Sequence, residues 1–169
     1  MDTKYLTKAD FDANGQYLSA SLEFVGHIRI AASLGWVRFT RISAQGAIVA
    51  EAGTGIEAGW GIEAGEGIKA GTGIEAGEGI EAGRGIEAGG GIKAGTGIEA
   101  GWGITCRLAL VAKLSIFAGI CTWRRTTEAD RKIVCAQLEG SVAYGSVELI
   151  APVTAEVVSA AEVAQSDEA

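Results

Sequence analysis

The side chains best suited to acid–base chemistry are few and scattered. His27 is the only histidine, the residue type that most readily takes up a proton near neutral pH. No motif places a second acid or base beside it, and the glutamates form a regular series rather than one pair in contrasting surroundings. We therefore interpret His27 as a hydrogen-bonded residue of an early strand. The sequence assigns no catalytic residue, and we expect a non-enzymatic protein without a cofactor.

A short acidic segment near the N-terminus is the one candidate for a metal site. Asp10, Asp12 and Asn14, followed by Gly15, match the first half of a calcium loop, in which alternate residues supply oxygen ligands. The position of the closing glutamate holds Ser21. We interpret the segment as an Asx-rich turn and predict no metal site.

Cysteines and charge restrict the class of protein further. Cys106, Cys121 and Cys135 have spacings that match neither a zinc site nor a redox pair, so we expect reduced, packed thiols. The N-terminus lacks the features of a secretory signal, and no apolar stretch is long enough to span a bilayer. We expect a cytoplasmic protein with no membrane contact. Its acidic blocks, residues 51–103 and 133–169, disfavour direct nucleic-acid binding and favour basic partners.

The elements that position these charges come from a six-residue repeat, I-[E/K]-A-G-x-G. Isoleucine and the small residue two positions later fall on one side of a strand, and the charged residue between them falls on the other. The G-x-G that follows is typical of a corner, where glycine is free to adopt positive φ. Short strands separated by corners predict a β-solenoid. The repeated isoleucines are Ile56, Ile62, Ile68, Ile74, Ile80, Ile86, Ile92, Ile98 and Ile104.

Three repeats make a triangular coil, and the charges favour that closure. Stacking every third repeat sets Glu66 beside Arg84, Lys69 beside Glu87 and Glu75 beside Lys93, whereas a coil of four repeats produces only like-charge neighbours. We therefore predict an all-β, single-stranded β-solenoid. Its parts are an N-terminal cap with irregular first coils (1–52), the regular solenoid (53–118), a C-terminal β-hairpin cap around a Glu139-Gly140 turn (119–152) and an acidic tail (153–169).

The units IEAGEG and IKAGTG resemble the hexapeptide repeats of bacterial acyltransferases, over residues 53–118. That resemblance implies a left-handed β-helix. The sequence departs from the family pattern at the residue two positions before the isoleucine, where bulky residues such as Trp60 replace a small one. Those enzymes generally use a histidine as general base, and His27 lies outside the repeats. The runs GIxAGxG, IFAGICTWR and LEGSVAYG also resemble uncharacterised proteins of bacteria, phages and mobile elements.

The residues most suited to binding a partner lie on the outside of the predicted coils. Trp60 and Trp102 occupy corners, where either another part of the chain or a partner must cover them, and Trp123 with Arg124 and Arg125 forms a second candidate patch. The outward charges form a ladder of six glutamates, Glu57, Glu63, Glu75, Glu81, Glu87 and Glu99.

These features predict a protein-binding module that acts by occupying a surface of its partner. A narrower hypothesis is a phage or mobile-element inhibitor that mimics nucleic acid and blocks a basic nucleic-acid-handling or defence complex of the host. Two alternatives come from other classes. One is a self-assembling structural solenoid, joined as a homo-oligomer through its ends or edges, and the other is an acyltransferase-like enzyme.

Overall fold

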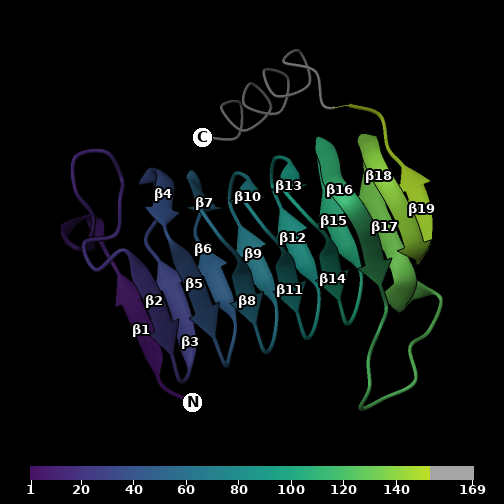
Figure 1. Ribbon diagram of the computed structural model, residues 1–169, viewed down its shortest axis with the longest axis horizontal. Helices are drawn as coiled ribbons and strands as arrows, with labels where there is room; N and C mark the ends of the chain where they lie inside the picture. Colours follow the sequence, from purple (N-terminus) through teal and green to yellow (C-terminus); the bar gives the residue numbers. More distant parts are fainter. Residues whose placement is uncertain (153–169) are drawn as a thin grey trace, which may run out of the picture.

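A computed structural model describes residues 1–152, and the predicted acidic tail lies outside them. Parallel strands follow one another along the long axis, from β1 at one end to β19 at the other (Figure 1). They form three columns, which we call faces A, B and C. Face A consists of β1 (Thr3–Leu6), β3 (His27–Ile30), β6 (Ile48–Ala50), β9 (Ile68–Ala70), β12 (Ile86–Ala88), β15 (Ile104–Cys106), β17 (Lys132–Cys135) and β19 (Ser146–Leu149).

Faces B and C are joined where one long strand turns from one face to the other. Face B consists of β2 (Ser21–Phe24), β5 (Arg41–Ala44), β8 (Ile62–Ala64), β11 (Ile80–Ala82), β14 (Ile98–Ala100) and the end of β16 (Ala109–Ala118). Face C consists of β4 (Gly35–Phe39), β7 (Thr54–Ala58), β10 (Ile74–Ala76), β13 (Ile92–Ala94) and the start of β16. The predicted all-β solenoid with triangular coils is therefore confirmed.

Identical residues stack on one another along each face. On face B, Ile62 pairs with Ile80 and Ile80 with Ile98, so each coil of the regular part holds three repeats. The first coils are longer, since Leu22 pairs with Ile42 and Ile42 with Ile62, a wider spacing along the chain than that from Ile62 to Ile80. This difference explains why the six-residue period fails before residue 53, although the strands continue.

The core is a ladder of isoleucine and small residues enclosed by the three faces. Ile80 and Ala82 are 1% and 2% exposed, whereas Glu81 between them is exposed. This alternation follows from the period-two geometry of a strand, which sends neighbouring side chains to opposite sides.

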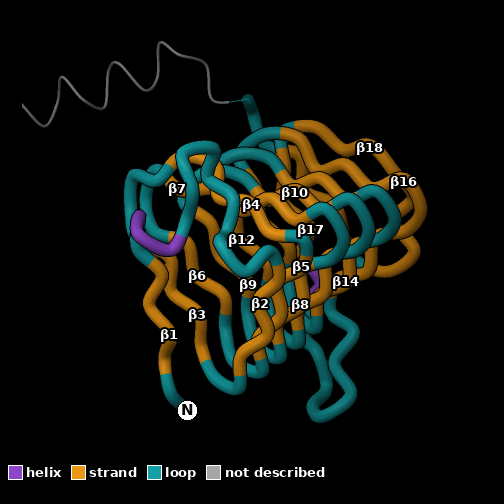
Figure 2. Tube along the Cα trace, turned by 60° about the vertical axis from the view of Figure 1, so that its left-hand side comes forward, coloured by secondary structure: helices purple, strands orange, loops and turns teal. Residues whose placement is uncertain are grey.

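The corner glycines have a different role from the one predicted. Among the corner glycines of residues 53–118, Gly53 alone has a positive φ, +73°, and those from Gly55 to Gly103 do not. Instead, the backbones of successive corners lie so close together that a Cβ on Gly77 would overlap the carbonyl oxygen of Gly59, and one on Gly95 would overlap that of Gly77. The corners stack along the molecule (Figure 2). From Gly65 to Gly101, the first glycine of each G-x-G is thus required by close backbone approach.

The N-terminal segment covers the first coil. A 3-10 turn, η1 (Lys8–Asp10), leads into an antiparallel bridge between Phe11 and Tyr17. The rings of Phe11 and Tyr17 lie 5.8 and 5.3 Å from that of Phe39, which belongs to the core. Aromatic packing therefore shields this end of the core from water.

The predicted C-terminal hairpin is wrong. After a long loop that ends in η2 (Ala129–Arg131), β17 pairs in parallel with β15 and β19, and β18 (Gln137–Tyr144) pairs in parallel with β16. Gly140 has φ +131° and lies inside β18, where it replaces a longer corner rather than forming a turn. The Glu139-Gly140 pair resembles a hairpin turn in sequence, but the chain continues the coil in a shortened form.

In β11, Ile80 points into the core and Glu81 points to the solvent, and this assignment can be tested by substitution. Replacing Ile80 with Asp buries an unpaired charge and should lower the free energy of unfolding by about 4 kcal/mol or more. Glu81→Lys, one residue away on the exposed side, should change it by less than about 0.5 kcal/mol. Urea denaturation of both variants measures the difference, and similar losses would show that the assigned facing is wrong.

The second prediction concerns the corner glycines and uses two positions of one corner. Gly77→Ala should cost about 1–3 kcal/mol, because its Cβ meets the backbone of the preceding corner. Gly79→Ala is the matched control. Its Cβ would lie 3.4 Å from the Thr96 hydroxyl oxygen, an ordinary contact, so its effect should stay within about 0.5 kcal/mol. Equal effects in urea denaturation would contradict the close-approach explanation.

Candidate binding surface

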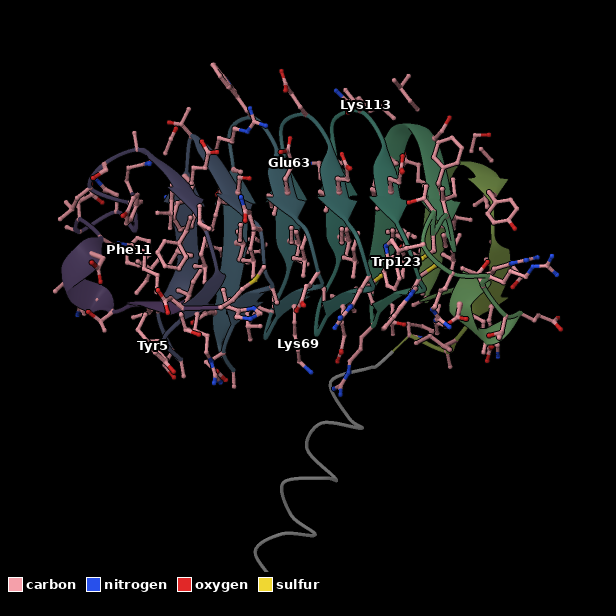
Figure 3. The ribbon with its side chains drawn as sticks, turned by 90° about the horizontal axis from the view of Figure 1, so that it is seen from below. Tyr5, Phe11, Glu63, Lys69, Lys113 and Trp123 are labelled. Atoms are coloured by element: carbon pink, nitrogen blue, oxygen red, sulfur yellow. The ribbon has the colours of Figure 1, made fainter. Side chains whose placement is uncertain are left out.

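The glutamate ladder predicted from the repeat does not form one surface. Successive repeats lie on successive faces, so the six residues are divided among all three. Figure 3 shows Glu63 and Lys69, from adjacent repeats, on opposite sides of the molecule. Face C holds Glu57 and Glu75, face B holds Glu63, Glu81 and Glu99, and face A holds Glu87.

Ion pairs to neighbouring coils neutralise half of these glutamates. Three pairs join residues of adjacent coils: Arg38 Nε to Glu57 at 2.9 Å, Arg41 Nη2 to Glu63 at 2.6 Å, and Lys69 Nζ to Glu87 at 3.1 Å. The predicted pair of Arg84 with Glu66 is present at 3.4 Å. Glu75 lies beside Lys93 in the register of face C. Glu81 and Glu99 make no ion pair within residues 1–152 and stack directly on each other.

The unpaired glutamates line a groove on face B. Its volume is about 470 Å³, and it runs along the corner between faces C and B. Trp60, 58% exposed, lies near one end of it, one coil after Arg41, and Leu114, 62% exposed, lies in the last coil that contributes. Phe117 stacks on Glu99 at the far end. The groove thus combines uncompensated negative charge with exposed apolar surface.

The two corner tryptophans lie on different corners and have different surroundings. Trp102 lies between faces B and A, with the guanidinium carbons of Arg84 and Arg124 at 5.4 and 4.8 Å from its ring centroid. The ring of Trp123 lies 6.2 Å away. Cation–π and ring contacts therefore cover Trp102 within the chain. Trp60 remains exposed, so the part of the chain that the structure describes covers one of the two tryptophans and leaves the other open.

The second candidate patch lies on the loop between β16 and η2. Trp123 is 59% exposed (Figure 3). Arg124 donates to Asp130 at 2.7 Å, and hydrogen bonds from Thr127 together with that guanidinium hold the pKa of Asp130 below its usual value. Arg125 is exposed on the same loop. Since Arg124 also covers Trp102, this patch contributes to the fold and offers only Trp123 and Arg125 as open contacts.

The residues considered first for acid–base and metal chemistry are engaged in backbone hydrogen bonds. His27 Nδ1 accepts the Ala47 N–H at 2.9 Å, which confirms the interpretation of a hydrogen-bonded strand residue. Asp12 accepts the N–H groups of Asn14 and Gln16 at 2.8 and 2.9 Å, as expected for an Asx turn. Within residues 1–152, no group of three His, Cys, Asp or Glu side chains is placed to hold a metal ion.

Two of the three cysteines are buried on neighbouring coils of face A. Ile104 pairs with Ile133, which places Cys106 next to Cys135. Burial, with a smaller contribution from Cys135, raises the pKa of Cys106 to about 11, and burial also raises that of Cys135. All three cysteines are free thiols. The two buried thiols stay protonated at neutral pH and serve as small core residues.

Comparisons of the chain with protein-family models, characterised proteins and solved structures found no match. The parallel β-solenoid agrees with the repeat β-helix that the sequence units imply, and no match supports a relation to the acyltransferases or to the proteins of bacteria, phages and mobile elements. Among residues 1–152, no helix is long and apolar enough to cross a membrane.

Sequence reasoning missed several residues of the groove. Glu78, Thr96 and Leu114 line it from the corner, and Arg41 and Phe117 line it from face B. The signal was available in part, because Trp60, Glu78, Thr96 and Leu114 occupy the same corner position in every third repeat. Because every third repeat lies on the same corner of a triangular coil, this position predicts that the four residues stack in one column.

Proposed function

We propose that the protein is a non-enzymatic binding module and that face B binds a basic segment of a protein partner. The main support for this proposal is the groove on face B. In it, Glu81 and Glu99 lack ion pairs within the described residues and lie between Trp60 and Leu114. Faces A and C offer a weaker case, since their predicted glutamates lie beside cations of the same face.

The chemistry of the groove fits arginine or lysine side chains. Neighbouring parallel strands lie about 4.8 Å apart, and Glu81 and Glu99 stand in register on two of them, so one extended basic segment can meet both. A guanidinium or ammonium group can also stack on the exposed ring of Trp60, a contact worth ~0.5–1 kcal/mol at exposed sites. Leu114 and Phe117 provide apolar contact for the stems of such side chains.

The non-enzymatic part of the proposal is supported by the engagement of the candidate base. His27 Nδ1 already accepts a backbone N–H, and the groove on face B contains no histidine. The carboxylates of the groove repeat in similar surroundings rather than forming an acid and a base with separated roles. Binding by surface occupancy requires neither.

A narrower form of the proposal concerns the identity of the partner. A column of uncompensated carboxylates competes with a phosphate backbone for the same cations, so a basic nucleic-acid-binding groove is one partner that face B suits. Such a protein would inhibit a host nucleic-acid-handling or defence complex, as an inhibitor from a phage or mobile element would. This hypothesis names the class of partner that binds face B and requires no second binding site on the protein.

The third prediction tests face B with a fluorescently labelled oligoarginine peptide as the probe. The double variant Glu81→Lys with Glu99→Lys should bind the peptide on the order of tenfold more weakly, because two attractions of ~1 kcal/mol or less become repulsions. It should also show a smaller dependence of affinity on salt. Fluorescence anisotropy at several salt concentrations measures both effects.

The control carries the same change of net charge at other sites. Glu75→Lys with Glu128→Lys places the reversals on face C and on the loop before η2, and it should bind within about twofold of the parent protein, since distant surface charges are screened. His27→Ala should likewise leave affinity unchanged. If the control variant loses as much affinity as the face B variant, binding depends on net charge alone and the proposed surface is wrong.

A further inference from the structure

The last coil of the solenoid leaves its core open. Val147 stacks on Ile133 and Leu149 stacks on Cys135, so both continue the inward ladder of face A. Ile133 and Cys135 are 0% exposed, whereas Val147 is 42% and Leu149 is 64% exposed. Residues that would be fully buried in any inner coil are thus bare here, because among residues 1–152 no further coil covers them.

The backbone of this coil is also open. Strand β19 pairs only with β17, and β18 pairs only with β16, so the outer side of each strand presents unpaired N–H and C=O groups within the described part of the chain. A long edge strand with exposed apolar side chains is a template for pairing with another strand. Both elements lie at the end of the molecule opposite β1 (Figure 1).

The two ends of the solenoid differ. At the first coil, Tyr17 is 8% exposed and packs with Phe11 against Phe39, so the core is covered by the chain itself. Strands β1 and β2 also have a free edge in the described part of the chain, but their inward residues Leu6 and Leu22 are only 1% and 8% exposed, so the first coil offers little bare core to a second molecule. Contact through the last coil therefore buries the most apolar surface when the last coils of two copies meet.

We infer that the open last coil is a dimerisation surface, on which β18 and β19 of one copy meet the same strands of a second copy across a two-fold axis. A two-fold contact uses one patch on both copies and closes the assembly. It covers Val147 and Leu149 and supplies partners for the free edge.

Charge also favours a second copy. The outward charges of the two edge strands are Glu139 on β18 and Glu148 on β19, and Glu148 is paired with Lys132 at 2.7 Å. Glu139 is thus the one charge of these two strands without an ion pair in the described part of the chain, and two copies that meet through the strands oppose fewer carboxylates there than they would through faces rich in glutamate. A partner selected for the acidic groove of face B finds no matching charge at this end.

The experiment is light scattering coupled to size-exclusion chromatography of the full chain over a series of concentrations. We expect a mass twice that of one chain, falling toward the mass of a single chain on dilution. Leu149→Glu should yield a monomer at every concentration, since it places a charge on the two-fold contact. Leu18→Glu is the matched control, because Leu18 is 68% exposed at the covered end, and it should remain a dimer.

Hydrogen exchange makes the assignment independent of the variants. The amides of β18 and β19 should be protected at concentrations where the chain is a dimer and exchange faster on dilution. A monomer at all concentrations overturns the inference, as does a dimer that Leu149→Glu leaves intact or that Leu18→Glu dissociates equally. Protection of these amides in a monomer also overturns it, since the rest of the chain, residues 153–169 included, then covers the end.

Discussion

The structure depends on the close stacking of successive coils in register. Isoleucine on isoleucine at every third repeat fills the interior, and that stacking is possible only where the corner backbones can approach each other, as Gly77 does over Gly59. Parallel pairing between coils then supplies hydrogen bonds to every face at once. The same constraint fixes the exterior, because each outward residue of the regular coils has one neighbour above and one below, each three repeats away along the chain.

The sequence predicts much of this fold and less of its surface. Period six and the alternation of Ile80, Glu81 and Ala82 predict the strands and which side chains point into the core, because both are local consequences of strand geometry. Opposite charges three repeats apart, such as Lys69 and Glu87, predict the triangular closure. The glycine role is missed, since sequence cannot distinguish a residue needed for positive φ from one needed for close approach. The C-terminal hairpin is missed because Gly140 shortens a corner within β18, and local sequence does not say whether the chain reverses or continues.

The binding surface follows from the coil rather than from the repeat. A ladder of glutamates in successive repeats suggests one acidic face, but triangular closure distributes it over three, and arginines from the irregular first coils neutralise Glu57 and Glu63. What remains is the short column of Glu81 and Glu99 with Trp60 and Leu114 beside it. The chain thus offers a charged groove on its side and an apolar edge at its end, two surfaces suited to different partners.

The central claim is the register that stacks each repeat on the third one after it, and zero-length carbodiimide cross-linking of the native protein tests it most directly. This reagent joins an amine to a carboxylate that already touches it, and Lys69 Nζ lies 3.1 Å from Glu87. Mass spectrometry of the digested protein should find a link between Lys69 and Glu87, the same position three repeats later. A Lys69 that is joined instead to carboxylates at other spacings, with no link to Glu87, would contradict the account.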